Sequence, residues 1–237
     1  MKPTSHAMLR CALAVLFVCA GSARAGEVLD TFDDGSNPNG WRWSAGNDGV
    51  PGSVQPTGGN PGGWFDSDAP YWASHPGIYA VPDDGSPLRA ALASGELVSV
   101  SVDFQKLDVW DVPNCVPTNS APSKFSLKLI DLHSMGGNQS VYAWRTGASA
   151  PGGAAYPWTT AQFDIPWNSS DTPPGWTLVS PDPSYTWADL MNNLDSIALL
   201  PVGLDDIVFD ACWHLGVDNV RVSFGDAIFR DGFEAAD

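Results

Sequence analysis

Aspartate is the side chain in this sequence that is best suited to binding an ion. Asp218 opens an alternating segment in phase with Val220 and Val222, so its carboxylate is expected to face the core side. A buried carboxylate needs a partner, which can be a metal ion, backbone amides or an arginine. The first and last strands of a β-sandwich often lie together, which would bring the acidic segment 30–34 close to Asp218. We predict a structural calcium ion bound by Asp30, Asp33, Asp34 and Asp218, with loop amides as an equally weighted partner for Asp218.

Tryptophan is the second residue type that could bind a ligand, because its flat ring matches the apolar face of a sugar. The chain has 11 tryptophans, and five of them lie in or beside segments rich in glycine and proline. These candidates for a sugar-binding platform are Trp41, Trp43, Trp64, Trp72 and Trp110. The alternative is that the rings pack in the core, as aromatic side chains commonly do.

Enzyme chemistry is not indicated by the motifs. The sequence contains neither a G-x-S-x-G nucleophile turn nor an H-E-x-x-H zinc motif. A glycosidase needs two carboxyl groups on either side of the scissile bond. The only glutamates are the scattered Glu27, Glu96 and Glu234, and no aspartate pair is singled out by its pattern. We therefore expect a protein that is not an enzyme.

The beginning of the chain has the three parts of a secretory signal. Lys2 and Arg10 precede an apolar run over residues 11–20, and Ala23-Arg24-Ala25 is a small-x-small cleavage site. The apolar run is half the length of a membrane span, and no later stretch is long and apolar enough to cross a bilayer. We predict a cleaved signal peptide over residues 1–25 and a secreted, periplasmic or cell-surface protein.

Charge and cysteine content agree with export. The chain has 27 acidic and 11 basic residues, a formal net charge of −16 that disfavours nucleic acid and anionic lipid as partners. Two cysteines follow the signal segment, and in an oxidising compartment a lone pair is most simply one disulfide. We predict a bond between Cys115 and Cys212.

The elements that position these residues are mostly strands. Apolar and polar residues alternate over five segments, at 97–104, 125–129, 141–145, 161–165 and 217–224. One helix is indicated, because Trp187, Leu190, Met191 and Leu194 form a single apolar stripe after the candidate cap Thr186. Many short strands and one short helix predict an all-β fold, a two-sheet antiparallel jelly-roll sandwich.

Three segments together resemble the laminin domain IV (laminin B) family of secreted bacterial proteins. They are GGNPGG with the following WFDSD at 58–68, the strand 98–104, and the succession of helix 187–194, strand 197–200 and GVDNVRV at 216–222. The resemblance implies a laminin B-like β-sandwich domain over residues 26–224, extracellular and without enzymatic activity. The tail, residues 225–237, contains IFRDGFE, which is similar to a C-terminal motif of other exported Gram-negative proteins. The Pro/Asn-rich segment around Cys115 departs from the family pattern.

These observations predict an exported, non-catalytic binding or adhesion module for a glycan or cell-surface polymer. A structural, calcium-stabilised extracellular protein without a small ligand is the alternative, and a glycan-active enzyme ranks third. The sequence leaves the identity of the ligand and the oligomeric state open.

Overall fold

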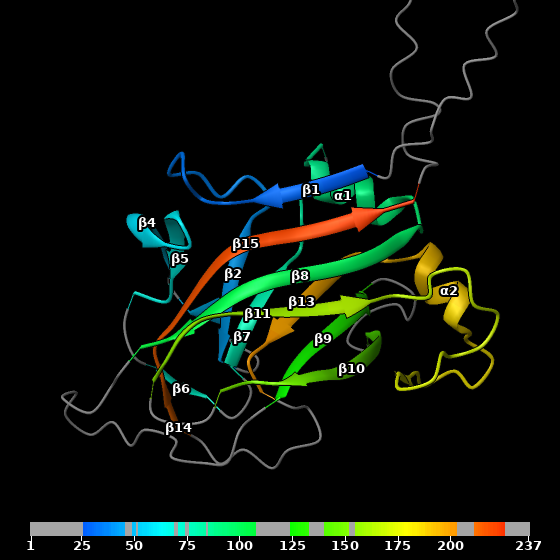
Figure 1. The fold of residues 1–237 in the computed structure, drawn as a ribbon. Helices are drawn as coiled ribbons and strands as arrows, with labels where there is room; N and C mark the ends of the chain where they lie inside the picture. The colour runs from blue at the N-terminus through cyan, green and yellow to red at the C-terminus, as the bar shows by residue number, and fades with distance from the viewer. Residues whose placement is uncertain are drawn as a thin grey trace, which may run out of the picture.

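Two antiparallel sheets face each other in the computed structural model and enclose the apolar core between them (Figure 1). The structure describes residues 26–45, 49–50, 52–68, 71–73, 76–83, 85–107, 124–132, 140–151, 155–202 and 211–225. The predicted fold class, an all-β two-sheet antiparallel sandwich, is confirmed. Within these described ranges, no helix is long and apolar enough to cross a membrane. The predicted signal peptide and the IFRDGFE motif lie outside the described residues.

The six-stranded sheet is at the front of Figure 1. Its strands lie in the order β11-β8-β15-β5-β4, and β1 pairs with the end of β15. They are β1 (Gly26–Asp30), β4 (Ser53–Gly59), β5 (Gly62–Asp66), β8 (Leu97–Lys106), β11 (Tyr156–Asp164) and β15 (Leu215–Phe224).

The seven-stranded sheet lies behind it in the order β12-β10-β9-β13-β7-β2-β3 (Figure 1). Its strands are β2 (Trp41–Ala45), β3 (Gly49–Val50), β7 (Pro76–Ala80), β9 (Lys124–Asp131), β10 (Val141–Ser149), β12 (Thr177–Val179) and β13 (Ser196–Leu200). A separate pair is formed by β6 (Tyr71–Ala73) and β14 (Ala211–Trp213).

The alternating pattern of the sequence determines which side chains enter the core. Val100, Val102 and Phe104 of β8 are buried, as the alternation predicts. Val98 is an exception: the register between β8 and β15 shifts at Phe224, which pairs with Leu97. Leu97 is therefore buried, and Val98 is 38% exposed instead of lying in the core.

Aromatic rings join the two sheets across the core. Phe104 of β8 stacks on Phe125 of β9 with ring centroids 5.6 Å apart. Phe65 of β5 stacks on Trp43 of β2 at 5.6 Å and on Phe32 at 5.8 Å. Each of these contacts buries large apolar surfaces, and such burial is the main force that holds a sandwich together.

Two helices occur among the described residues where the sequence predicts one. The predicted helix is α2 (Trp187–Asn192), which begins with a capping box in which Thr186 and Asp189 bond each other's backbone amides. It ends before Leu194, the last residue of the predicted apolar stripe. The additional helix is α1 (Pro87–Ala93), whose N-cap Ser86 accepts a hydrogen bond from the amide of Arg89. Its Ser-Pro start is a helix signal as well as a turn signal.

Candidate functional site

Two of the predicted platform tryptophans lie in the core. Trp41 is 2% exposed and Trp43 is fully buried. Both belong to β2, where they point inward while Arg42 between them points outward. The indole N–H of Trp41 donates to a carboxylate oxygen of Asp30 at 2.6 Å. The prediction that these two rings face a ligand is therefore wrong.

Trp64 is 9% exposed and belongs to a small aromatic pair on the outer face of the six-stranded sheet. Its ring packs edge-on against Trp158 of β11 with centroids 5.9 Å apart. Gly216 of β15 lies beneath both rings, because a Cβ there would lie 2.6 Å from Trp64 and 3.1 Å from Trp158. The side chain of Trp72 and all of Trp110 lie outside the described residues, so their predicted roles stay predictions.

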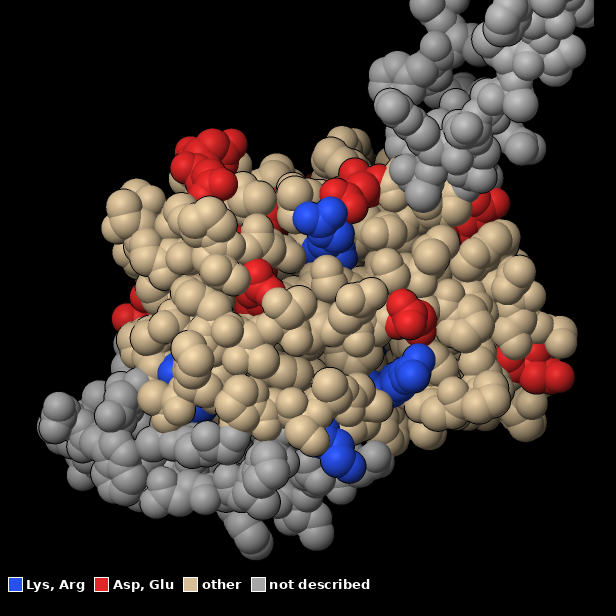
Figure 2. All heavy atoms as spheres, in the orientation of Figure 1, with Lys and Arg blue, Asp and Glu red and all other residues tan. Residues whose placement is uncertain are grey.

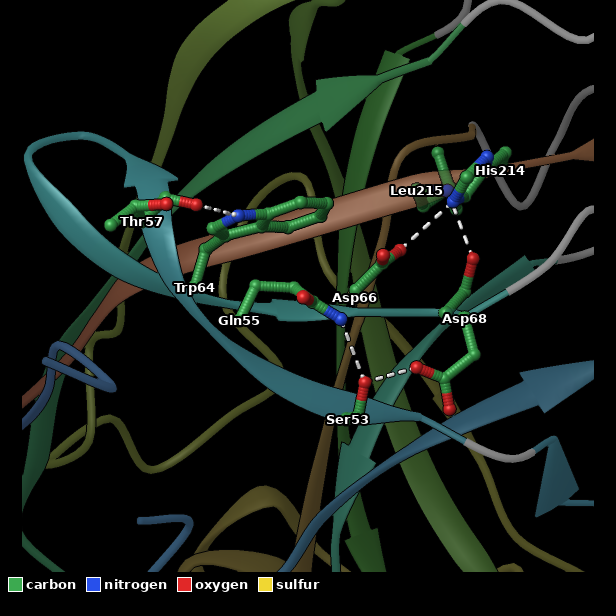
Figure 3. A network of polar contacts seen from close by, with 9 residues as sticks. Ser53, Gln55, Thr57, Trp64, Asp66, Asp68, His214 and Leu215 are labelled. Carbon is green, nitrogen blue, oxygen red and sulfur yellow. Dashed lines mark hydrogen bonds and ion pairs between the residues drawn. The ribbon is translucent and has the colours of Figure 1, made fainter. Parts of the chain in front are cut away.

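Polar contacts fix the β4–β5 hairpin that carries Trp64 (Figure 3). The indole N–H of Trp64 donates to the carbonyl of Thr57 at 3.0 Å. At the other end of the hairpin, the side chains of Ser53 and Asp68 are hydrogen-bonded, and Asp66 contacts Nε2 of His214 at 2.9 Å. These bonds hold Trp64 in place against the sheet, and its ligand-binding role stays a prediction.

Asp218 is fully buried, as predicted, but it does not face the core. It pairs with Asp103 of β8, whereas the preceding pair, Val217 and Phe104, points inward. A register irregularity after Asp218, with Asn219 at a φ of +48°, reverses the phase before Val220. Alternation alone places Asp218 on the wrong face, because a bulge cannot be recognised from the alternation.

The Gly-Asn-Pro-Gly turn of the β4–β5 hairpin covers Asp218. The carboxylate of Asp218 accepts hydrogen bonds from the backbone amides of Asn60 at 2.5 Å and Asn219 at 2.7 Å. Asp103 accepts from the side-chain amide of Asn60 at 3.2 Å, and Asp33 accepts from the amide of Gly63 at 2.8 Å. Three carboxylates from three parts of the chain therefore hold this turn, and Asp218 is bonded to loop amides, the alternative left open by its sequence.

The four aspartates predicted to bind calcium do not share one hydrogen-bond network: Asp33 and Asp218 bond the same hairpin turn, whereas Asp30 and Asp34 have other partners. Asp30 accepts from the side chains of Asn39 and Trp41, and Asp34 accepts from the amide and hydroxyl of Ser36. Within the predicted set, Asp34 influences Asp30 electrostatically and Asp33 influences Asp218. No three carboxylate, histidine or cysteine groups come together as a metal-binding group in the described part of the chain. Calcium binding stays a prediction.

Burial raises the pKa of Asp218 to about 6, and the nearby carboxylates Asp33 and Asp103 add to this rise. The ordinary pKa of an aspartate in the unfolded chain is lower, so the folded state binds the proton more tightly between these values. The stabilisation that protonated Asp218 provides is present at low pH and is lost as the pH rises through about 6.

We therefore expect the free energy of unfolding to increase when the pH is lowered from 7 to 5. Asp218→Asn should show a weaker pH dependence over this range, because it removes the carboxyl group whose pKa burial raises to about 6. Urea denaturation at pH 5, 6 and 7 in the presence of a chelator measures how the free energy of unfolding changes with pH in the wild type and in the variant. An equal change of unfolding free energy with pH in the two proteins would show that Asp218 does not titrate in this range.

A different set of exposed rings lies on the outer face of the seven-stranded sheet. The strand register places six residues in one row across this face, in the order Thr177, Trp144, Lys128, Ala198, Tyr79 and Arg42. Their inward-facing neighbours on the same strands, including Ala143, Leu127, Leu129 and Ile78, are fully buried. Trp144 and Tyr79 are half-buried, and Arg42 is exposed. Tyr142 lies beside this row on β10.

Sequence reasoning missed this row for a specific reason. The alternation of residues 141–145 does place Tyr142 and Trp144 on one face of a strand. Tyr79 and Trp144, however, share a row only because β13 and β9 lie between their strands. That arrangement depends on strand order and register, which the local pattern does not determine.

A pocket of about 500 Å³ lies where α1 and α2 meet the end of the seven-stranded sheet. Asp131, Asp195 and Arg89 line it. Arg89 donates to Asp195 at 2.9 Å, and the hydroxyl of Tyr185 donates to Asp131 at 2.6 Å. Asp195 also accepts from the backbone amide of Leu132. Both carboxylates thus take part in bonds that fasten helix and loop segments to the sheet.

The predicted disulfide stays a prediction, because Cys115 lies outside the described residues; Cys212 is 1% exposed. Comparison of the chain with models of known protein families finds no match, and neither curated proteins nor solved structures match it. The resemblance to the laminin B family therefore stays a prediction, and function has to be inferred from the geometry of the chain itself.

Proposed function

We propose that this protein is an exported, non-catalytic binding module for a glycan or other cell-surface polymer. The single observation that carries the proposal is the row on the outer face of the seven-stranded sheet, with Trp144, Tyr79 and the adjacent Tyr142 incompletely buried. Rings held on a sheet lose little freedom on binding, and their faces match the apolar faces of sugars. Polar groups beside them can bond the sugar hydroxyls.

The spacing of the two principal rings supports an extended ligand. Trp144 on β10 and Tyr79 on β7 are separated by the two strands β9 and β13. Three steps between strands amount to about 14 Å. Lys128 and Ala198 lie between the rings in the same row, and neither has an aromatic side chain. A short stretch of oligosaccharide can therefore contact both rings at once.

A glycan array with purified protein tests the proposal. We expect binding to at least one glycan, and Trp144→Ala and Tyr79→Ala should each weaken it about tenfold, as expected for a central aromatic contact. Trp158→Ala is the matched control, because Trp158 lies on the outer face of the other sheet, and it should leave the affinity unchanged.

The alternatives predict other outcomes. A structural protein without a small ligand would bind no glycan on the array. A glycan-cleaving enzyme would release reducing sugar from the bound polymer. Equal losses in the control and in the two variants of the row would place the binding elsewhere.

A further inference from the structure

Charge is distributed unequally between the two outer faces of the sandwich. On the described strands of the seven-stranded sheet, the outward positions include Arg42, Lys124 and Lys128 and no aspartate or glutamate. The chain as a whole has 27 acidic and 11 basic residues. Among the described strand positions of this face, three cations and no acid therefore contrast with the composition of the chain.

The opposite face has the composition expected of the whole chain. Its outward positions include the exposed Glu27 and Asp164, and also Asp103 and Asp218, which are buried under the β4–β5 hairpin. Acidic side chains are scattered over this face, together with several basic ones, among uncharged residues (Figure 2). Arg221, one of the cations on this face, donates to Glu27 at 2.8 Å and is therefore already paired.

The cations of the seven-stranded sheet lie next to its rings. Lys128 is the neighbour of Trp144 in the row, and its ammonium group lies 3.8 Å from the ring centre of Tyr142. Arg42 is the neighbour of Tyr79. The row thus contains an aromatic–cation pair twice, and the two rings Trp144 and Tyr79 are three strand steps apart, about 14 Å.

Among the described residues, neither of these two cations is paired with an acid. Within the described part of the chain, the guanidinium of Arg42 makes no ion pair or hydrogen bond, and the ammonium of Lys128 contacts only the ring of Tyr142. Partial burial lowers the pKa of Lys128, which shows that its ammonium group has lost some of its water. An ammonium that has lost water and lacks a carboxylate gains when an anion approaches, and a guanidinium binds a carboxylate with two parallel hydrogen bonds.

We infer that this face binds an acidic glycan, a linear polysaccharide whose sugars carry carboxylate groups at regular intervals. Trp144 and Tyr79 contact the sugar rings, while Lys128 and Arg42 each bind a carboxylate of the polymer. This inference rests on the proposed function and specifies the class of ligand. The overall negative charge of the protein would repel the polymer from the opposite face of the sandwich, so it also orients the complex.

The test compares each uronate polymer of a panel, polygalacturonate among them, with its own methyl-esterified form. Esterification keeps the sugar chain and removes the charge. We expect at least tenfold tighter binding of an acidic form than of its ester at low salt, measured by calorimetry. The difference should shrink in 0.5 M salt, because ions screen exposed charges over distances of a few ångströms at that concentration.

Single substitutions show which side chains cause the preference for the acidic polymer. Arg42→Gln and Lys128→Gln should each weaken binding of the acidic polymer about tenfold and leave binding of the ester nearly unchanged. Arg221→Gln removes the same charge from the opposite face and should have no effect on either ligand. Thermal melting of each variant confirms that it is folded.

The outcomes separate the charge inference from the proposed function. If acidic and esterified polymers bind equally, and Trp144→Ala weakens both, the charge inference is wrong and the proposed function stands. If Arg221→Gln is as harmful as Arg42→Gln, binding depends on the overall charge of the protein and not on this face, and the inference is overturned. If no glycan in either form binds, both proposals fail.

Discussion

Replacement of Trp43 by alanine is expected to lower the free energy of unfolding by about 3–5 kcal/mol, the usual cost of removing a large aromatic side chain from a core. Trp43 is fully buried, and its ring stacks on Phe65 at a centroid distance of 5.6 Å and an interplanar angle of 12°. Because Trp43 belongs to one sheet and Phe65 to the other, the variant loses a contact between the two layers of the sandwich as well as buried area.

Two comparisons make this expectation specific. Trp144→Ala removes the same atoms from the outer face of the same sheet, where the ring is only half-buried, and should cost about 1 kcal/mol. Trp43→Phe keeps the stacking and removes an indole N–H that has no hydrogen-bond partner in the described structure. An unpaired buried donor is itself costly, so this variant should lose much less than alanine does.

Urea denaturation of the three variants provides the measurement. The slope of the transition should stay the same, so that the midpoint alone reports stability. Equal destabilisation by Trp43→Ala and Trp144→Ala would contradict the assignment of one ring to the core and the other to the surface. Together with the binding data, the pair separates stability from function: Trp43→Ala should unfold the protein more easily, and Trp144→Ala should weaken glycan binding.

The segment Trp41-Arg42-Trp43 shows what the sequence could have predicted. Its alternation places both indoles on one face of a strand and the arginine on the other. The neighbouring glycine and proline residues favour a loop here instead, and that interpretation predicts that the two buried tryptophans bind a ligand. It does not single out Arg42. The alternation in 97–104 and 217–224 predicts the buried side chains correctly over most of its length, because there the apolar runs are long enough to outweigh local irregularities.

Register is what the sequence did not determine. The bulge after Asp218 reverses the direction of that side chain, and the shift at Phe224 puts Leu97 in the core in place of Val98. The row with Trp144 and Tyr79 likewise requires the order of four strands that are distant in sequence. Such features depend on pairing between strands, whereas periodicity reports only on one strand at a time.

The Gly-Asn-Pro-Gly turn, the most conspicuous motif of the sequence, has a structural role, and Gly63→Ala should reveal it. A Cβ at this position would lie 2.3 Å from the carbonyl oxygen of Phe32 and 3.1 Å from the Cα of Asp33. Both contacts are with backbone atoms, which cannot move aside as the end of a side chain can. We expect a loss of about 3 kcal/mol, the upper end of the cost of adding atoms to a packed region.

The matched control is Gly35→Ala. Gly35 has a φ of +77°, and a Cβ added there would meet no other atom, so alanine should cost about 1 kcal/mol through backbone strain alone. Gly63→Ala should exceed that cost because it separates the hairpin from the loop after β1. It would also break the bond from the Gly63 amide to Asp33, and it should thereby weaken the bonds from the same turn to Asp103 and Asp218.

Loss of the bonds between the turn and these carboxylates should also change how stability depends on pH. Asp218 owes its raised pKa first to burial beneath this turn, so displacement of the hairpin should return its pKa toward the ordinary value. Gly63→Ala should therefore show a weaker dependence of stability on pH between 5 and 7 than the wild type, whereas Gly35→Ala should keep the wild-type slope. If Gly63→Ala is destabilised but keeps that slope, the turn is not what buries Asp218, and the carboxylate must be desolvated by other parts of the sheet.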